Sequence, residues 1–156
     1  KLYGFDYDLD IDLANNLSFN QKISLTKGFE KRSNNPLIDI PPLSAKHEIT
    51  WNISNYKNLE ITVESEYVSR QNDYPDNNFD VYISRTDSYV SLDVSTTPSD
   101  YHLLHLKSSM SLSKKTKIGL RVNNLLDESY RDYLNRMRYF ADDLGINFSL
   151  FINTSF

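Results

Sequence analysis

The sequence contains no cysteine and no long apolar run, and with four glycines and five prolines it is neither low-complexity nor collagen-like. Without cysteine the 156-residue chain has no disulfide, no cysteine-based zinc site and no cysteine nucleophile. Since no run of about 18 apolar residues occurs, there is no transmembrane helix, and a β-barrel is the remaining way to span a membrane. A net charge of −4, without a basic patch interleaved with aromatic residues, argues against a nucleic-acid-binding protein.

Aromatic residues are abundant, at 13% of a chain that is only 39% hydrophobic, and this suits β-structure with apolar residues on one face. From Tyr3 to Leu13 every second residue is apolar, and the intervening residues are Gly4 and the aspartates Asp6, Asp8, Asp10 and Asp12. The last eleven residues, 146–156, alternate in the same way except at Phe151. This period of two predicts strands that separate two unlike environments.

The same pattern predicts strands at 3–13, 17–29, 46–53, 59–67, 101–112, 117–123 and 146–156, with an additional hairpin at 79–95. Asn15 and Asn16 indicate a turn. A short connection there would pair Leu13 with Leu17 and place Asp8 opposite Lys22, an acceptable cross-strand pair.

The connections between the predicted strands alternate in length. Short turns follow the first, third and fifth strands, whereas 30–43, 69–100 and 124–145 are long and polar. Short periplasmic turns, long outer loops and two-faced strands are the signature of outer-membrane barrels. A soluble β-sandwich also alternates, so the loop asymmetry is what favours an all-β, antiparallel transmembrane barrel. Because bacterial barrels normally have an even number of strands, seven strands predict a fragment of a larger barrel.

The last third of the chain carries motifs that resemble the C-terminal end of a TonB-dependent outer-membrane receptor. They are a strand ending in Asn124-Leu125, a loop start with an acidic residue and Tyr-Arg at 127–131, Gly-Ile-Asn-Phe at 145–148, and the terminal Phe156. The Ile40-Pro41-Pro42 loop before a Trp-bearing strand extends the resemblance to essentially the whole chain.

The resemblance implies that residues 1–156 are the C-terminal portion of a 22-stranded barrel with a plugged lumen, roughly its last seven strands. The plug domain and the earlier strands are not among these residues.

The implied function is active transport, across the outer membrane of a Gram-negative bacterium, of a scarce nutrient such as a ferric siderophore, haem or another metal chelate. The implied partners are the TonB complex, acting through the plug, the outer-membrane assembly machinery, the lipid bilayer and the small-molecule chelate. Neither a cofactor nor an enzymatic activity is expected. Two alternatives stay open: a structural subunit that completes a larger outer-membrane barrel with a partner chain, and a soluble β-sandwich binding module.

Two sets of residues are predicted to act. The outer loop 130–143 holds the predicted ligand-binding residues Arg131, Arg136, Arg138 and Tyr139, since arginine among aromatic rings suits anionic or aromatic chelates. The alternative is that this loop only extends the last hairpin above the membrane. The apolar positions of the closing strand are predicted to be the signal that the assembly machinery reads by edge pairing: Phe148, Leu150, Ile152 and Phe156. The alternative there is an ordinary apolar strand end.

The charged residues of the polar face predict a solvated lumen wall rather than a metal site. Same-face neighbours on a strand lie about 6.5 to 7 Å apart, a poor geometry for one ion. This applies to the aspartate row and to Glu60, Glu64 and Glu66. His102 and His105 differ in parity and should point to opposite faces, and His47 is distant. Neither a histidine metal site nor a Ser-His-Asp arrangement is expected.

Overall fold

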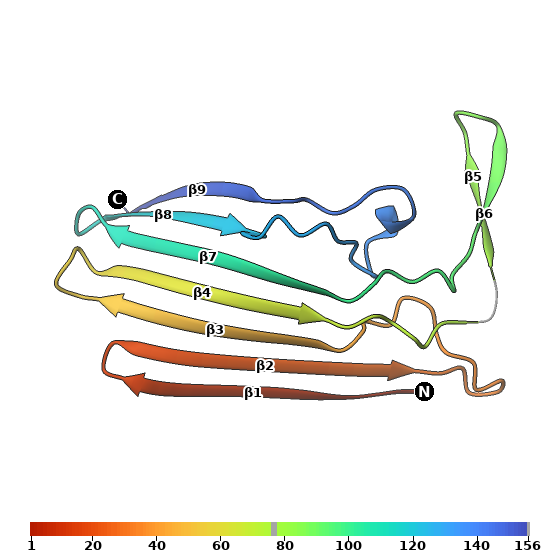
Figure 1. Cartoon of the computed structure of the whole chain (residues 1–156), viewed down its shortest axis with the longest axis horizontal. Coiled ribbons are helices and arrows are strands. Elements are labelled where there is room, and N and C mark those ends of the chain that lie inside the picture. Colours follow the sequence, from red (N-terminus) through yellow and green to blue (C-terminus); the bar gives the residue numbers. More distant parts are fainter. Residues whose placement is uncertain (76–77, 156) are drawn as a thin grey trace.

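The fold is an antiparallel sheet with a separate hairpin (Figure 1). A computed structural model describes residues 1–75 and 78–155. Seven strands form the sheet in the order β1-β2-β3-β4-β7-β8-β9, and β5 and β6 form a two-stranded sheet of their own. The large sheet consists of β1 (Leu2–Ala14), β2 (Leu17–Gly28), β3 (Ser44–Ile53), β4 (Leu59–Val68), β7 (Tyr101–Ser111), β8 (Thr116–Asn123) and β9 (Asn147–Thr154). The hairpin consists of β5 (Phe79–Ile83) and β6 (Ser88–Leu92). The predicted all-β, antiparallel, seven-stranded arrangement and the additional hairpin are confirmed.

The first hairpin shows how far the register was predictable. Asp8 lies opposite Lys22 as expected, with the carboxylate 3.6 Å from the ammonium nitrogen. Near the turn the register shifts between Asp12 and Ala14, and Ala14 pairs with Leu17. The predicted pairing of Leu13 with Leu17 is therefore wrong, because an irregularity inserts an extra residue just before the turn.

One face of the sheet is apolar across all seven strands. Cross-strand partners share a face, so the pairing extends each row from edge to edge. One row consists of Ile11, Phe19, Ile49, Val63, Leu106, Val122 and Phe148. The apolar side chains of the edge strand β9 are strongly exposed: Phe148 of this row is 68% exposed, and Leu150 on the same face is 76% exposed. Water-soluble monomers rarely expose so large a contiguous apolar surface, so this face requires an apolar environment.

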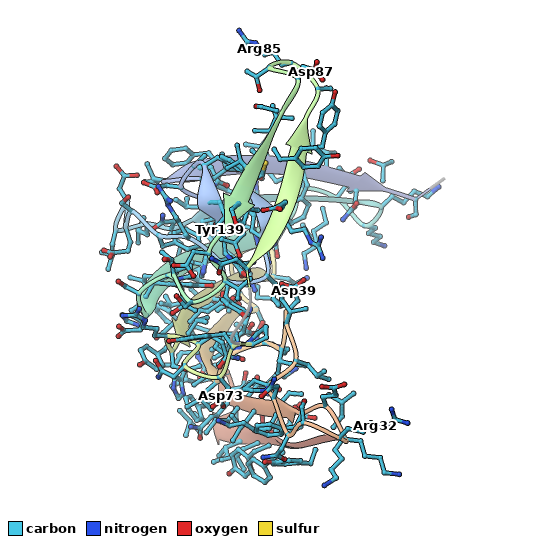
Figure 2. All side chains as sticks on the ribbon, turned by 90° about the vertical axis from the view of Figure 1, so that its right-hand side faces the viewer. Arg32, Asp39, Asp73, Arg85, Asp87 and Tyr139 are labelled. Atoms are coloured by element: carbon cyan, nitrogen blue, oxygen red, sulfur yellow. The ribbon has the colours of Figure 1, made fainter. Side chains whose placement is uncertain are left out.

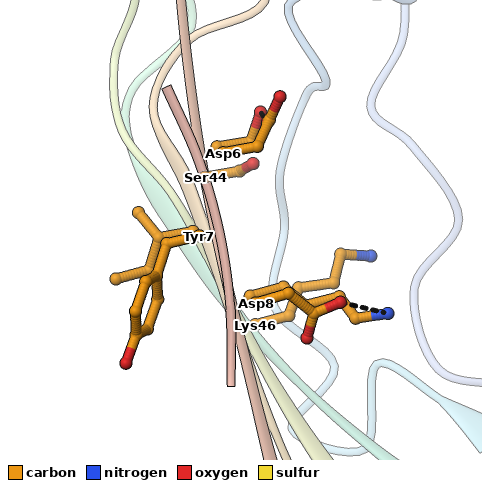
Figure 3. A pocket seen from close by; sticks show the side chains of 8 residues that line it. Asp6, Tyr7, Asp8, Ser44 and Lys46 are labelled. Carbon is orange, nitrogen blue, oxygen red and sulfur yellow. Dashed lines mark hydrogen bonds and ion pairs between the residues drawn. The ribbon is translucent and has the colours of Figure 1, made fainter. Parts of the chain in front are cut away.

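The opposite face is polar. The neighbouring row reads Asp10, Asn20, Glu48, Glu64 and His105. Figure 3 shows the alternation on β1, where Asp6 and Asp8 point to one side of the strand and Tyr7 to the other. The sheet thus separates two environments, as the period-two pattern predicted.

Long and short connections lie at opposite ends of the sheet (Figure 1). The turns after β1, β3 and β7 gather at one end, where β9 also ends, and the chain begins at the other end among the long loops. In the turn after β3, Lys57 and Asn58 both have left-handed backbone conformations, with φ of 53° and 48°. Tight hairpin turns favour two such residues, because their twist matches that of the flanking strands.

Helical structure is minor. The one helical element in the described ranges is the 3-10 helix η1 (Arg136–Tyr139) in the last loop. No helix among the described residues is long and apolar enough to cross a membrane. The closing strand β9 is shorter than predicted, and Phe156 lies outside the described residues, so its part in that strand stays a prediction.

A small buried cluster fastens the last loop to the loop end of the sheet. It consists of Val68 on β4 with Tyr101 and Leu103 on β7, and Tyr130 from the last loop packs against it. The rings of Tyr101 and Tyr130 lie 4.6 Å apart between centroids, within the range of favourable aromatic contacts. This cluster positions the loop that carries the predicted ligand-binding residues.

Candidate functional site: the loop end and the polar face

The last loop begins at Asn124, which directs its first turn. Asn124 is almost fully buried and has a φ of 50°, a left-handed conformation that asparagine tolerates better than most residues. Its side-chain amide donates to the main-chain oxygen of Glu128 at 2.8 Å and accepts from the Glu128 amide at 2.9 Å. The same amide group reaches the oxygen of Leu144 at 3.4 Å. One side chain therefore ties the start of the loop to its end.

Asp127 closes the loop from the other side. Its carboxylate accepts a hydrogen bond from the Ile146 amide at 2.8 Å. A side chain at Gly145 would displace this carboxylate, because a Cβ would lie 2.5 Å from the Asp127 carboxylate oxygen. The motif residues that resemble the receptor family thus have structural tasks at the base of the loop.

Within the loop, Arg131 bonds to partners in its own segment. Its Nε donates to Asp142 at 2.5 Å and its Nη1 donates to the main-chain oxygen of Arg138 at 2.8 Å. The hydrogen bond from Arg131, with a second from Ser129, lowers the pKa of the Asp142 carboxyl below its ordinary value. Arg131 therefore connects the two sides of the loop.

Arg138 is buried in the loop. Its guanidinium carbon lies 4.5 Å from the ring centre of Tyr133 and 4.6 Å from that of Tyr139, which is cation–π geometry. The guanidinium also donates to the Tyr133 main-chain oxygen and, at 2.9 Å, to the Tyr139 hydroxyl. Burial raises the pKa of the Tyr133 phenol, an effect that the Arg138 charge opposes. Two buried polar atoms at this position lack hydrogen-bond partners among the described residues: Arg138 Nε and the Tyr133 hydroxyl.

Asp39 connects the last loop to the loop between β2 and β3. Its carboxylate accepts a hydrogen bond from Arg136 at 2.9 Å and lies 3.6 Å from Arg138. The residue has a φ of 56°, so the turn at 38–39 presents the carboxylate from a left-handed backbone. Figure 2, which looks at the loop end, shows Asp39 and Tyr139 near the middle of the loops, while Arg85 and Asp87 mark the tip of the β5–β6 hairpin. Local sequence patterns do not indicate Asp39, because its partners are 97 and 99 positions away.

The structure therefore distinguishes among the predicted ligand-binding residues. Arg138 and Arg131 bond within the loop, and Tyr139 stacks on Arg138. Arg136 has a 79% exposed side chain and is the arginine of this set that a solute reaches most easily. A direct role in ligand binding stays a prediction for all four residues.

The polar face carries a second arrangement of charged residues. Glu64 on β4 bonds to Lys107 on β7, and Lys107 also lies 3.4 Å from Glu48. Lys46 approaches Glu66 at 3.1 Å. His105 lies directly opposite Glu64 in the register, on the polar face, whereas His102 lies on the other face and bonds to Ser65 at 2.7 Å. The two histidines thus point to opposite faces, as their parity predicted.

Glu64, Glu66 and His105 bring their ligand atoms within 4.8 Å of one another, which raises the question of a metal site. The main-chain N–H of Asn124 donates to His105 Nδ1 at 3.3 Å, so Nδ1 carries a lone pair and the proton of the uncharged ring lies on Nε2. Nε2 then has no lone pair to offer a metal; it lies 3.6 Å from the Glu66 carboxylate and makes no hydrogen bond among the described residues. With Lys46 and Lys107 already beside these carboxylates, the arrangement suits an ionic network better than a metal site.

No protein-family model matches the sequence, and no curated protein sequence matches it. Solved structures match its fold. The copper transporter OprC superposes with a TM-score of 0.80 at 17% identity, over 99% of this chain and 23% of that one. The ferric enterobactin receptor PfeA from Pseudomonas aeruginosa matches with a TM-score of 0.71 at 16% identity, over 99% and 22% of the two chains. The FrpB iron transporter from Neisseria meningitidis matches with a TM-score of 0.69 at 14% identity, over 98% and 23%.

These neighbours are TonB-dependent outer-membrane receptors of Gram-negative bacteria, and they are transporters and receptors rather than enzymes. This chain spans about a fifth of their length, since it covers 23%, 22% and 23% of the three. It has the fold of part of such an antiparallel barrel, as the sequence predicted. In this fold the apolar face of a strand meets lipid and the polar face lines the lumen. The polar face described above is therefore called the lumen face.

Proposed function

We propose that this chain is the C-terminal part of the barrel of a TonB-dependent receptor. In this proposal the complete receptor lies in the outer membrane of a Gram-negative bacterium and imports a scarce nutrient. The supporting observation is that the two-faced sheet, with short turns at one end and long loops at the other, superposes over 99% of its length on a transporter of this kind. Energy would come from the TonB complex acting on a plug that is not among these residues.

We propose a metal chelate, such as a ferric siderophore or haem, as the substrate class. Two structural neighbours are a ferric enterobactin receptor and an iron transporter, and a third is a copper transporter. The loop end of this chain offers an exposed arginine, Arg136, in the same 3-10 helix as Tyr139, and arginine among aromatic residues suits anionic or aromatic chelates. The anionic parts of the chelate would meet this surface before entering the lumen.

The test is uptake by cells from which the gene has been deleted. Under iron limitation we expect the protein to become more abundant, and the deletion strain to take up less radiolabelled ferric chelate than the wild type. The remaining uptake should not fall further when TonB is also removed. If abundance does not respond to iron and the deletion leaves chelate uptake unchanged, the metal-chelate assignment is wrong, and sugars or vitamins become the substrates to assay.

A second candidate is a separate subunit that completes a larger barrel with a partner chain. The observation that favours it is that β1 and β9 are both edge strands of the described sheet, and a barrel in lipid leaves no edge unpaired. An antibody against residues of this chain separates the two candidates. A band several times heavier than 18.2 kDa indicates one long receptor chain, whereas a band near 18.2 kDa that co-purifies with a larger barrel protein indicates the subunit.

A further inference from the structure

The charges of the lumen face are unevenly distributed. The strands β1 to β4 carry nearly all of its carboxylates, namely Asp6, Asp8, Asp10, Asp12, Glu48, Glu60, Glu64 and Glu66, together with Lys22 and Lys46. The strands β7 to β9 carry Lys107, Lys117 and Arg121 on this face. Lys107 stands at the boundary and bonds to Glu64. Among the described residues, no carboxylate lies within ion-pair distance of Lys117 or Arg121.

These two cations border a pocket of about 440 Å³ on the lumen face. The register places Arg121 beside Lys107 on one side and Ser149 on the other. Ser109 also lines the pocket, and its hydroxyl is buried with no hydrogen-bond partner among the described residues. A buried hydroxyl without a partner is costly, so a ligand that accepts its hydrogen bond would be favoured there.

An aromatic ring lies between the two cations. Phe151 is the residue that breaks the alternation of the closing strand, and the register places it on the lumen face opposite Gly119. A Cβ at Gly119 would collide with the Phe151 ring and would lie 2.7 Å from the Ser108 oxygen, so only glycine admits the ring. Gly119 lies two residues from Lys117 and two from Arg121 on the same face of β8, so a charged side chain flanks the ring on each side.

We propose that this pocket binds an oxyanion, a carboxylate or a phosphate, whose attached flat apolar group lies on Phe151. Arg121 would pair with two oxygens of the anion, Lys117 would supply a second positive charge, and the Ser109 hydroxyl would donate a hydrogen bond. Among the described residues, Glu60 is the one carboxylate that lines the pocket, against three cations. Lys107 also bonds to Glu64, and the charges of Lys117 and Arg121 keep the pocket positive. The biological role rests on the proposed transport function, in which a solute crossing the lumen passes this face. Two sources fit the chemistry: a soluble anion, or an acidic side chain from another segment of the same receptor.

The experiment uses the complete polypeptide in detergent micelles at low salt, where electrostatic attraction is least screened. Binding of 4-fluorobenzoate is followed by fluorine NMR, with 4-fluorobenzamide as the neutral probe of the same shape. We expect the benzoate to bind and the benzamide not to bind. The double variant Lys117→Gln/Arg121→Gln should raise the Kd for the benzoate at least about tenfold, since two charge-assisted contacts are lost. Lys22→Gln is the matched control, because Lys22 lies on the lumen face of β2 and pairs with Asp8 outside the pocket.

The outcomes distinguish the two sources. Benzoate binding that only the double variant weakens indicates a soluble anion. If the wild type does not bind benzoate, but the double variant lowers the Tm and Lys22→Gln does not, the anion is a carboxylate of the receptor itself. If neither binding nor a selective loss of Tm is found, the site proposal is overturned. None of these experiments measures uptake, so their results can be interpreted even if the proposed transport function is wrong.

Discussion

Replacing Arg138 and Arg136 separately tests how the outer loops are held together. Both arginines interact with Asp39, but Arg138 is buried between two tyrosine rings and Arg136 has a 79% exposed side chain. Methionine is the suitable replacement at both positions, because it keeps a long apolar chain and removes the charge. Each variant loses a positive charge that interacts with Asp39, but only the charge of Arg138 is buried.

The structure indicates a large effect for Arg138→Met. The variant loses two cation–π contacts, the hydrogen bonds to the Tyr133 oxygen and the Tyr139 hydroxyl, and the charge beside Asp39. Removing one partner of a buried charged arrangement costs about 3 to 5 kcal/mol. Arg136→Met loses one exposed ion pair, which contributes about 0 to 1 kcal/mol. The local free energy of opening of the last loop should therefore fall by about 3 kcal/mol in the first variant and by less than about 1 kcal/mol in the second.

Hydrogen exchange measures this free energy segment by segment in the complete protein in detergent micelles. A loss of about 3 kcal/mol corresponds to roughly a hundredfold faster exchange, provided that the loop's own opening limits the rate. We expect that acceleration in peptides covering 130–143 for Arg138→Met, with unchanged exchange in β7 and β8. Asp39→Asn should accelerate the same peptides, and also those covering 36–42.

Equal exchange rates in the two arginine variants would refute this reasoning, because they would mean that burial of Arg138 does not matter. Unchanged protection in Arg138→Met would do the same. The result also bears on function. If Arg138→Met opens the loop, any loss of ligand binding in that variant reports on the loop, and Arg136 becomes the residue with which to test direct contact with the ligand.

Two further predictions concern the same loop and the closing strand. The hydrogen bond from Arg131 lowers the pKa of Asp142, so its contribution to loop stability is present above the ordinary carboxyl pKa and is lost as the pH falls through the lowered value. In the wild type, pepsin should therefore cleave the loop faster at strongly acidic pH. The variant Asp142→Asn lacks this contribution at every pH, so a protease active at neutral pH should cleave its loop faster than that of the wild type. Equal cleavage of the two proteins at neutral pH would contradict this prediction. On the closing strand, Leu150→Lys should lower the amount of folded protein in the outer membrane, because a lysine facing lipid costs up to about 2 to 4 kcal/mol near the bilayer midplane. Ser149→Lys, one residue away on the lumen face, should have little effect, and equal losses in membrane fractions of the two variants would argue against both the lipid-facing orientation and a side-specific assembly signal.

The strands and their faces were predictable because alternation is a local property. Ile11 and Phe148 lie at the two ends of one apolar row, and each was assigned to the correct face from its immediate neighbours alone. The first hairpin register was nearly correct for the same reason, since a short turn fixes it. The opposition of Glu64 and His105 was not predictable, because β4 and β7 are separated by a long connection whose length sets no register.

The burial of Arg138 was beyond sequence reasoning for a different reason. Arg136 and Arg138 lie in the same 3-10 turn, and nothing local distinguishes them. What separates them is the folding of the loop, which places the Arg138 guanidinium against the Tyr133 and Tyr139 rings, since Asp39 interacts with both arginines. Pattern rules identify a segment rich in arginine and aromatic residues, but they do not show which arginine is exposed to solvent.

The residues that carry the family resemblance are also those with the clearest structural tasks. Asn124 and Asp127 hold the two ends of the last loop together, and Gly145 makes room for the Asp127 carboxylate. Such residues suit any receptor of this architecture whatever it transports, so they report on the barrel and not on the substrate. In the proposed receptor, selection among substrates would then depend on segments outside this motif. The β5–β6 hairpin is such a segment: it projects away from the sheet at the loop end, and its Tyr82 and Tyr89 rings are exposed and 5.2 Å apart (Figure 1). Exchanging this hairpin between receptors should therefore change ligand preference more than exchanging the loop that carries the motif.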